Sequence, residues 1–259
     1  MKNFFKISCL AILVLIGNYE ANSAEKVELL KTDWSFKGLF GKFDRASLQR
    51  GYQVYTEVCS SCHSMKYVSY RNLAEKGGPE FSTEQAKAIA ASFEVIDGPN
   101  NDGDMFERPA KLSDKFVMPY ENVKAAQAAN GGAYPPDMSV LAKARSGGVD
   151  YIYSVLLGYQ DPPSGVSLDD GVYYNKYMYG NNIKMAQPLS DGLIEYSDGT
   201  VASEEQMAKD VATFLMWAAE PHLEARHKMG FKAILYLIIL TILVYFSMKK
   251  IWSRIESEV

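Results

Sequence analysis

The sequence predicts a mainly α-helical domain that is exported across a membrane and tethered to it by one C-terminal helix. Three observations carry this prediction. The first 24 residues have the charge and apolar pattern of a signal peptide, and residues 231–248 form a second, longer apolar run. Between them, apolar residues recur at helical spacing behind side chains that cap helices, whereas convincing strand alternation is absent.

Residues 1–24 match a secretory signal peptide, with two lysines, an apolar run over residues 7–17 and small residues at the expected cleavage site. We expect cleavage after Ala24, with Ser23 as the alternative. The apolar run is too short to span a bilayer comfortably, and a mitochondrial presequence would be richer in arginine, so the pattern favours bacterial export. Cys9 is lost with the signal, which leaves two cysteines in the mature chain.

Capping side chains predict where the helices of the exported domain begin. We expect the polar stretch 97–108 and most of residues 159–200 to be irregular. The expected helices are Arg45–Val58 after Asp44, a helix from Ser82 to Phe93, one from Asn122 to Gly131, one from Pro135-Pro136-Asp137 to Arg145, one from Asp150 to Gly158, and one after Ser203 that carries Met207, Val211, Phe214 and Leu215 on one face.

The first of these helices leads into the central motif of the chain. Leu48, Tyr52 and Tyr55 repeat at positions i, i+4 and i+7 and mark its buried face. Gly51 on the same helix would allow another helix to cross closely. The alternative is a tolerated glycine, which costs about 1 kcal/mol of helix stability.

Residues 59–63 read Cys-Ser-Ser-Cys-His, the C-x-x-C-H pattern of covalent c-type haem attachment. Two cysteine sulfurs add to the two vinyl groups on one edge of the porphyrin, and two intervening residues let both sulfurs reach that edge from one helical turn. The adjacent histidine then offers its imidazole to the iron. The motif therefore predicts Cys59 and Cys62 as thioether anchors and His63 as the axial ligand.

A zinc site and a thiol–disulfide exchange site are alternative uses of a C-x-x-C pair. Zinc needs four ligands, and the remaining histidines, His222 and His227, follow far along the chain beside the membrane segment. A thiol–disulfide exchange site is expected in a βαβ setting, whereas the flanks of this motif have helical patterns. Both alternatives therefore explain the sequence less well than a haem.

Residues 231–248 are apolar except for Lys232, and their length is near the lower limit for a membrane-spanning helix. The alternative is a buried core helix, but only a short charged tail follows it. We therefore expect a signal peptide at 1–24, an exported domain at 25–228, a membrane anchor at 229–248 and a cytoplasmic tail at 249–259. Basic residues flank both ends of the span, so its orientation rests on the signal peptide.

The exported part is distinctly acidic. The full chain has a net charge of −4; the signal removes two lysines and one glutamate, and residues 229–259 remove four basic and two acidic residues, which leaves −7. This charge disfavours nucleic acid as a partner and favours a basic protein.

Further stretches, spread in order over most of the mature chain, accompany the C-x-x-C-H motif. Together they make the sequence resemble the cytochrome c1 family, the c-type haem subunit of the quinol–cytochrome c reductase (bc1) complex, in its bacterial form. The stretches are W-S-F-x-G-x-F-G-x-F-D from Trp34, L-Q-R-G-Y-Q-V-Y from Leu48, D-G-P-N from Asp97, R-P-A-K-L-S-D from Arg108, A-A-N-G-G-A-Y-P-P-D-M-S from Ala128, M-A-Q-P-L from Met185 and M-A-K-D-V-A-T-F-L-M-W-A-A-E-P from Met207.

The resemblance implies a class I cytochrome c-like haem domain with long loop insertions and a C-terminal transmembrane helix. Such a subunit takes one electron from the Rieske iron–sulfur protein and passes it through one haem c to a soluble or membrane-tethered cytochrome c. Cytochrome b would be its neighbour in the bacterial inner membrane, with the haem domain on the periplasmic side. The sequence shows no catalytic constellation of its own. The alternatives are a free-standing membrane-anchored electron shuttle and a haem enzyme such as a peroxidase.

The sixth iron ligand is expected to be a methionine, because a thioether raises the haem potential. Met118 and the proline after it look like the ligand loop of small soluble cytochromes, but the resemblance favours Met185. The resemblance also assigns Arg108 to a haem propionate, with a solvated loop arginine as the alternative. It places Pro135 and Pro136 against the haem face, with a helix-opening proline pair as the alternative.

Overall fold

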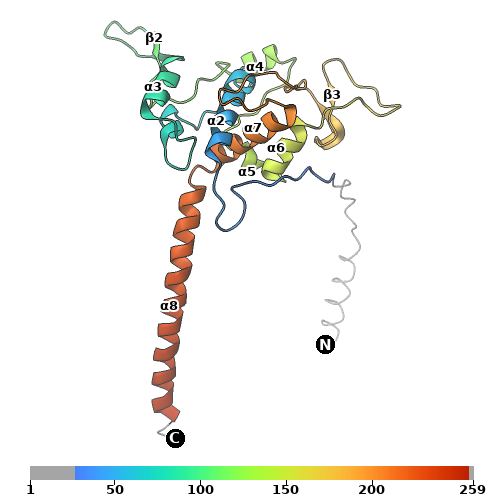
Figure 1. Cartoon of the computed structure of the whole chain (residues 1–259). Helices are drawn as coiled ribbons and strands as arrows, with labels where there is room; N and C mark the ends of the chain where they lie inside the picture. Colours follow the sequence, from blue (N-terminus) through green and yellow to red (C-terminus); the bar gives the residue numbers. More distant parts are fainter. Residues whose placement is uncertain (1–26, 257–259) are drawn as a thin grey trace, which may run out of the picture.

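The structure, a computed structural model, describes residues 27–256, so the predicted signal peptide lies outside the described residues. A head of short helices and long loops stands on one long helix, α8 (Figure 1). The prediction of a mainly α fold is confirmed. The elements are α2 Arg45–Val54, a π-helix Tyr55–Cys59, a 3-10 helix Tyr70–Ala74, α3 Thr83–Ala91, β1 Glu94–Asp97, β2 Phe106–Pro109, α4 Val123–Ala129, α5 Leu141–Ala144, α6 Gly148–Leu156, β3 Tyr173–Tyr174, a 3-10 helix Tyr179–Asn181, β4 Asn182–Ile183, α7 Glu204–Ala219 and α8 Leu223–Glu256.

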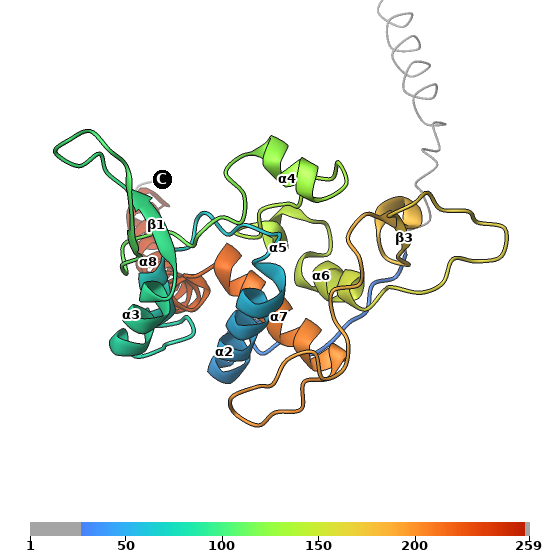
Figure 2. The same cartoon turned by 90° about the horizontal axis from the view of Figure 1, so that it is seen from above.

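Helices α2 and α7 cross at the centre of the head (Figure 2). Helix α2 begins where expected, because the carboxylate of Asp44 accepts a hydrogen bond from the backbone N–H of Ser47 at 2.8 Å. At the crossing, a Cβ atom added to Gly51 would lie 2.1 Å from the carbonyl oxygen of Asp210. The predicted role of Gly51 in a close helix crossing is therefore confirmed.

A buried ion pair joins the same two helices. The carboxylate of Asp210 is fully buried and receives hydrogen bonds from Nε and Nη2 of Arg50 at 2.8 and 3.2 Å. Gln206 donates to the same carboxylate at 2.9 Å. The bond to Asp210 raises the pKa of Arg50 although burial opposes the charge. Removing Arg50 would leave the buried carboxylate of Asp210 without its cation, so this pair fixes how α2 sits on α7.

Aromatic rings from α2, α7 and the connecting loops fill the space around the crossing. The ring centroids of Tyr70 and Phe116 lie 4.9 Å apart, and Tyr52 meets Phe214 at 5.8 Å. Tyr55 stacks on Phe116 at 6.0 Å, directly before the C-x-x-C-H motif. All five rings are buried, so the core packs against the turn that carries the motif.

Two predicted helices differ from the structure. The helix expected from Pro135 to Arg145 is reduced to the four residues of α5, because Asp137 folds its carboxylate onto the loop instead of opening a helix. Helix α6 begins at Gly148, before the predicted cap at Asp150. The carboxylate of Asp150 accepts hydrogen bonds from Lys37, on the segment before α2.

The segment expected to be a polar loop over residues 97–108 has paired ends. Strands β1 and β2 are antiparallel, with Glu94 opposite Pro109 and Asp97 opposite Phe106. The resulting hairpin projects from the head on the side away from α8 (Figure 1). A second short pair, β3 with β4, lies inside the region that was expected to be irregular. Neither pair is long enough to show strand alternation in the sequence.

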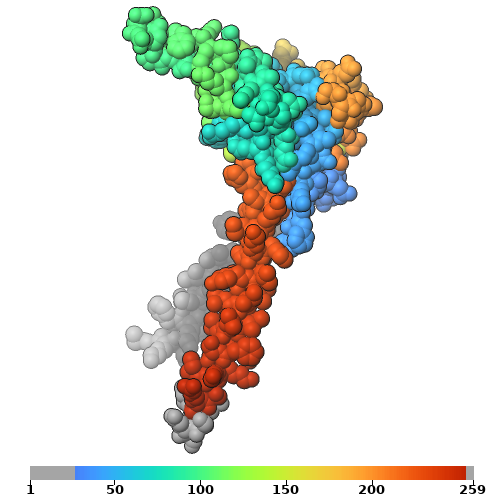
Figure 3. Space-filling view, turned by 60° about the vertical axis from the view of Figure 1, so that its left-hand side comes forward, coloured from blue at the N-terminus to red at the C-terminus, as the bar shows by residue number. Residues whose placement is uncertain are grey.

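Helix α8 begins at Leu223, before the predicted apolar run, and extends away from the head as a single rod (Figure 3). Among residues 27–256, it is the one helix long and apolar enough to cross a membrane, and none of its most apolar window is buried within the chain. Its first residue, Leu223, is buried against the head. The anchor therefore continues directly from a helix start that is docked on the domain.

Candidate haem-binding site

The C-x-x-C-H motif lies in the turn that follows helix α2. Helix α2 passes into the π-helix Tyr55–Cys59, where the N–H of Ser60 donates to the carbonyl of Tyr55 at 2.8 Å. The N–H groups of Cys62 and His63 then both donate to the carbonyl of Cys59, at 3.2 and 2.9 Å. Single π-turns of this kind are frequent at functional sites. The turn presents both cysteines as free thiols beside the histidine.

The environment of His63 leaves one ring nitrogen for a ligand. The Nδ1 atom lies 2.9 Å from the carbonyl oxygen of Pro136, and a carbonyl can only accept, so Nδ1 carries the hydrogen. Burial lowers the pKa of His63, against the smaller opposing effect of this hydrogen bond. The imidazole is therefore neutral with its lone pair on Nε2, which is the form that a metal-ligating histidine needs.

The loop that carries Pro136 is clasped to the segment after the motif by Asp137. Its Oδ2 atom accepts hydrogen bonds from Oγ of Ser64 at 2.7 Å and from the N–H of Lys66 at 3.0 Å. Its Oδ1 atom accepts from the N–H of Ser139 at 3.0 Å. Burial raises the pKa of Asp137, but these hydrogen bonds together hold it below its ordinary value. An ionised Asp137 thus fixes the backbone that orients His63.

The sequence did not predict these hydrogen bonds of Asp137, because its pattern placed Asp137 at the start of a helix. The available signal was a serine two residues after the aspartate, a spacing typical of a side chain that bonds its own backbone in a turn. The contacts to Ser64 and Lys66 join parts of the chain that lie far apart in sequence, and no local pattern predicts them.

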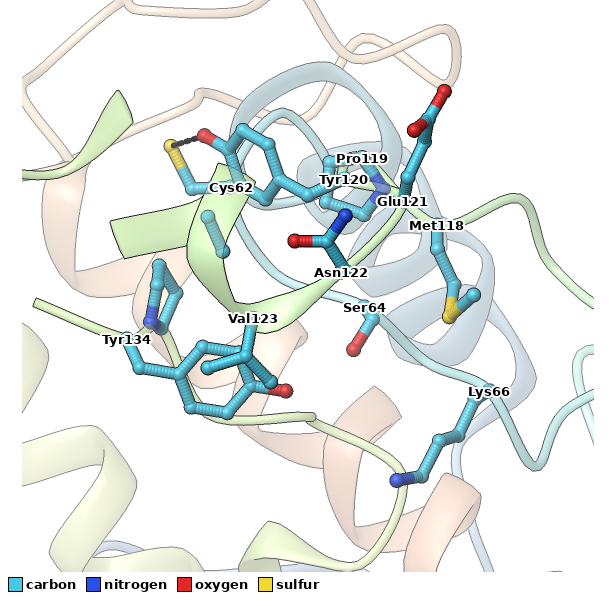
Figure 4. A pocket seen from close by; sticks show the side chains of 12 residues that line it. Cys62, Ser64, Lys66, Met118, Pro119, Tyr120, Glu121, Asn122, Val123 and Tyr134 are labelled. Atoms are coloured by element: carbon cyan, nitrogen blue, oxygen red, sulfur yellow. Dashed lines mark hydrogen bonds between the residues drawn. The ribbon is translucent and has the colours of Figure 1, made fainter. Parts of the chain in front are cut away.

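A pocket opens beside Cys62 (Figure 4), and Tyr120 points its hydroxyl at Sγ of this cysteine, 3.9 Å away. Burial raises the pKa of the deeper thiol, Cys59, to about 12, with a smaller effect from Cys62. Pro135 lines the pocket, while Pro136 holds His63 from the other side. Both predicted prolines therefore lie at the motif.

The structure brings Met118, and not Met185, to this pocket. Met118 is 52% exposed on the pocket wall. Met185 is half-buried on the loop after β4, and its carbonyl oxygen accepts a hydrogen bond from the hydroxyl of Tyr159 at 3.0 Å. Burial raises the pKa of Tyr159, so this hydroxyl keeps its proton and the bond at neutral pH. The choice of Met185 as the sixth ligand stays a prediction.

Arg108 lies on β2 with its guanidinium engaged by carboxylates of the chain. It forms an ion pair with Asp97 and donates to the two oxygens of Asp114 at 2.6 and 3.2 Å. The bond to Asp114 is the largest cause that raises the pKa of Arg108, followed by the bond to Asp97. The side chain is thus held in place rather than freely solvated. Its predicted contact with a haem propionate stays a prediction.

The zinc alternative lacks ligands in the part of the chain that the structure describes. There, no group of three or more His, Cys, Asp or Glu side chains is placed to hold a metal ion. Nδ1 of His227 lies 3.3 Å from the carbonyl oxygen of Gly41, at the start of α8. The two late histidines therefore do not complete a site at the motif.

Comparison with known proteins places this arrangement in a family. The Cytochrome C1 family matches residues 34–255, most of the described chain. The chain belongs to the cytochrome c1 family. It is 46% identical to cytochrome c1 of Rhodospirillum rubrum over 95% of this chain and 94% of that protein. It is 47% identical to mitochondrial cytochrome c1-1 of Solanum tuberosum over 93% of this chain and 74% of that protein.

A third relative is a longer protein. The cytochrome b/c1 of Bradyrhizobium diazoefficiens is 51% identical over 85% of this chain, which spans only 35% of that protein. Membership of the cytochrome c1 family implies a covalently bound haem c. The residues present fit that group, because the motif offers two free thiols and a neutral imidazole whose Nε2 is left for the iron.

Proposed function

We propose that this chain is the electron-transfer subunit of a quinol–cytochrome c reductase (bc1) complex. One haem c is attached through Cys59 and Cys62, with His63 and Met185 as the two iron ligands. The bound haem accepts and releases one electron, while the chain holds it and tunes its environment. The observation that carries the proposal is the neutral imidazole of His63, fixed by Pro136 beside two free thiols.

The partners follow from the role of such a subunit. We propose that the electron comes from the Rieske iron–sulfur protein, that it leaves to a soluble or membrane-tethered cytochrome c, and that cytochrome b is a neighbour. Relatives named "Cytochrome b/c1" and, in Candida albicans, "Cytochrome b-c1 complex catalytic subunit, mitochondrial" support an assembly with cytochrome b. They do not favour a free-standing shuttle.

The chain is anchored by a single helix, α8, which is long and apolar enough to cross a membrane. We propose that this is the bacterial inner membrane, with residues 25–228 on the periplasmic side, the anchor at 229–248 and the tail at 249–259 inside. The signal pattern of residues 1–24 and the bacterial relative in Rhodospirillum rubrum support this placement.

The remaining site residues have supporting roles in the proposal. Pro135 packs on the haem face and Pro136 holds the axial histidine. Arg108 pairs with a propionate while it keeps its bond to Asp114. Its fork of N–H donors suits two carboxylates at once, which a lysine would not.

Two measurements on the native protein test the function. Haem should remain on the mature chain after denaturation and acid–acetone extraction, and Cys59→Ser should leave at most one thioether link and shift the pyridine haemochrome band. Mild-detergent purification should recover quinol:cytochrome c reductase activity together with the chain. Complete extraction of haem would contradict the attachment. A pure haem protein without partners or reductase activity would contradict the role in a complex.

A further inference from the structure

The loop of residues 37–42, here called the tip loop, exposes two large apolar side chains. Leu39 is 66% exposed and Phe40 is 72% exposed. Such a pair at the end of a protruding loop is costly in water unless something covers it. The root of the loop is by contrast buried in the core, through Trp34, Phe36 and Phe43.

The tip loop has a fixed shape. The N–H of Gly41 donates to the carbonyl of Gly38 at 3.3 Å, and the N–H of Lys42 donates to the carbonyl of Ser35 at 3.0 Å. A Cβ atom added to Gly41 would lie 2.3 Å from the carbonyl oxygen of Phe36, so the turn closes tightly on itself. The exposed side chains are therefore presented by a closed turn on a buried root.

Three contacts dock the tip loop and its root along the start of α8, as the blue N-terminal segment beside the upper part of the red helix shows (Figure 3). Their partners on α8 are three and then four residues apart, so they share one face of the helix. As α8 leaves the head, successive contacts lie nearer the tip of the loop. The contacts are Phe43 N–H to Glu224 at 3.1 Å, His227 to the carbonyl of Gly41 at 3.3 Å, and the ring of Phe40 to the ring of Phe231 at 6.2 Å.

The position of Phe231 gives the depth of the tip loop. Phe231 is the first residue of the apolar run 231–248. Roughly 18 residues of helix span about 27 Å, slightly less than the hydrocarbon core of about 30 Å. The whole run is therefore needed to cross, and Phe231 must lie at the boundary between headgroups and acyl chains. Phe40 contacts Phe231 and must lie at the same level.

We propose that the tip loop is a second membrane contact, in which Leu39 and Phe40 enter the lipid boundary beside α8. The surroundings suit a lipid surface, because Lys42, Lys228 and Lys232 supply positive charge at the level of anionic headgroups. The proposal rests on α8 crossing the membrane and is independent of the haem ligands. It gives the head two attachments instead of one, so the head cannot swing freely about the start of α8.

Spin-label depth measurements on the mature, haem-loaded chain in lipid nanodiscs test the proposal. The two cysteines of the mature chain, Cys59 and Cys62, are taken by the haem, so a nitroxide attached at Leu39→Cys reports one position. Collisions with dissolved oxygen should exceed collisions with a water-soluble nickel complex there. Leu240→Cys, in the middle of the span, is the lipid reference. Met105→Cys, beside β2 and 60% exposed, is the water reference and should show the opposite order.

The outcomes separate the proposal from the anchor on which it rests. If the nickel complex dominates at Leu39→Cys while Leu240→Cys stays in lipid, the tip loop is in water and the proposal is overturned. If the label at Leu240→Cys is also in water, α8 does not cross the membrane, and both the membrane anchor and the tip-loop contact are overturned. The same label in the purified complex should keep its lipid signature. Protection from both reagents there would assign the tip loop to a neighbouring subunit instead of lipid.

Discussion

At the scale of single residues, the orientation of His63 depends on a carboxylate that never touches it. Asp137 accepts hydrogen bonds from Ser64 and Lys66 and thereby holds the loop whose Pro136 carbonyl fixes the imidazole. We expect Asp137→Ala to lower the free energy of unfolding by about 2–3 kcal/mol, because three donors, two of them in partly buried hydrogen bonds, lose a charged acceptor. Denaturant unfolding of the haem-loaded chain measures this effect. Asp161→Ala, at an exposed position, is the control and should change stability by less than about 0.5 kcal/mol.

The contribution of Asp137 should also depend on pH. Burial raises its pKa, but the bonds from Ser139, Lys66 and Ser64 bring it below the ordinary value. A carboxylate with a depressed folded-state pKa stabilises the fold above its unfolded pKa, and this is lost as pH falls through the folded pKa. The stability difference between wild type and Asp137→Asn should therefore be full above about pH 4 and shrink below it. An equal difference at pH 7 and pH 3 would contradict the role of the ionised form.

The sixth ligand can be tested by removing one sulfur at a time. Met185→Leu keeps the side-chain volume, so the fold should survive at a cost below about 1.5 kcal/mol. The weak sulfur-to-iron charge-transfer band of the oxidised protein should disappear and the reduction potential should fall. Met118→Leu is the matched control, since Met118 lies on the pocket wall at Cys62, and it should leave the band in place. The reverse pattern would move the ligand to Met118.

The residues of the site were predictable to different degrees. Chemistry fixes the spacing of Cys59, Cys62 and His63, so the prediction of these three residues rests on local sequence alone. The hydrogen bond from Nδ1 of His63 to the carbonyl oxygen of Pro136 and the hydrogen bonds to Asp137 depend on two loops meeting after folding. Arg108 shows the same limit, because the sequence predicted a cation but not the carboxylates that hold it.

At the scale of elements, the crossing of α2 and α7 can be tested by substituting Gly51. The sign of the stability change decides whether Gly51 is needed for the close crossing or is merely a tolerated glycine. Helix propensity alone favours Ala over Gly by about 1 kcal/mol. At Gly51, however, the new methyl group would clash with the carbonyl of Asp210 and with Cβ of Phe214. We expect Gly51→Ala to destabilise the protein by about 3 kcal/mol or more, since the two helices must move apart. Thermal unfolding measures the change.

The matched control is Gly230→Ala in α8. A Cβ atom there meets no heavy atom within 4 Å, so propensity should decide and stability should stay equal or rise slightly. Both glycines lie in helices, so helix propensity alone predicts that alanine stabilises the protein at each position. A stabilised Gly51→Ala protein would show that the crossing is not a tight contact.

Element boundaries followed the caps wherever the capping side chain had no stronger partner. Asp44, Ser82, Asn122 and Ser203 each accept a hydrogen bond at the start of the predicted helix. Asp150 failed as a cap because Lys37, from the segment before α2, takes its carboxylate. Local sequence patterns therefore predict where helices start, but they do not predict when a capping side chain is bound by a distant partner instead.

At the scale of the whole molecule, two acidic loops extend from opposite sides of the head. The hairpin between β1 and β2 projects on one side and the loop before β3 on the other (Figure 2). Asp97 of the hairpin pairs with Arg108, whereas Asp102 and Asp104, in the turn between the two strands, are exposed, as are Glu94 and Glu107 on the strands. An acceptor protein that docks beside one of these loops is therefore attracted less by the charges of the other loop.

We expect the second-order rate of electron transfer to a basic cytochrome c to fall as salt rises, by about tenfold across a wide salt series. The exposed charges act through water, where the Debye length is about 8 Å at physiological ionic strength. Asp102→Asn with Asp104→Asn should flatten this dependence more than Asp169→Asn with Asp170→Asn, because the hairpin leads through residues 110–117 to the pocket wall at Met118. Stopped-flow mixing measures both slopes. A rate independent of salt would exclude electrostatic steering while leaving the haem site intact, and a larger effect of the second pair would place the acceptor on the loop before β3.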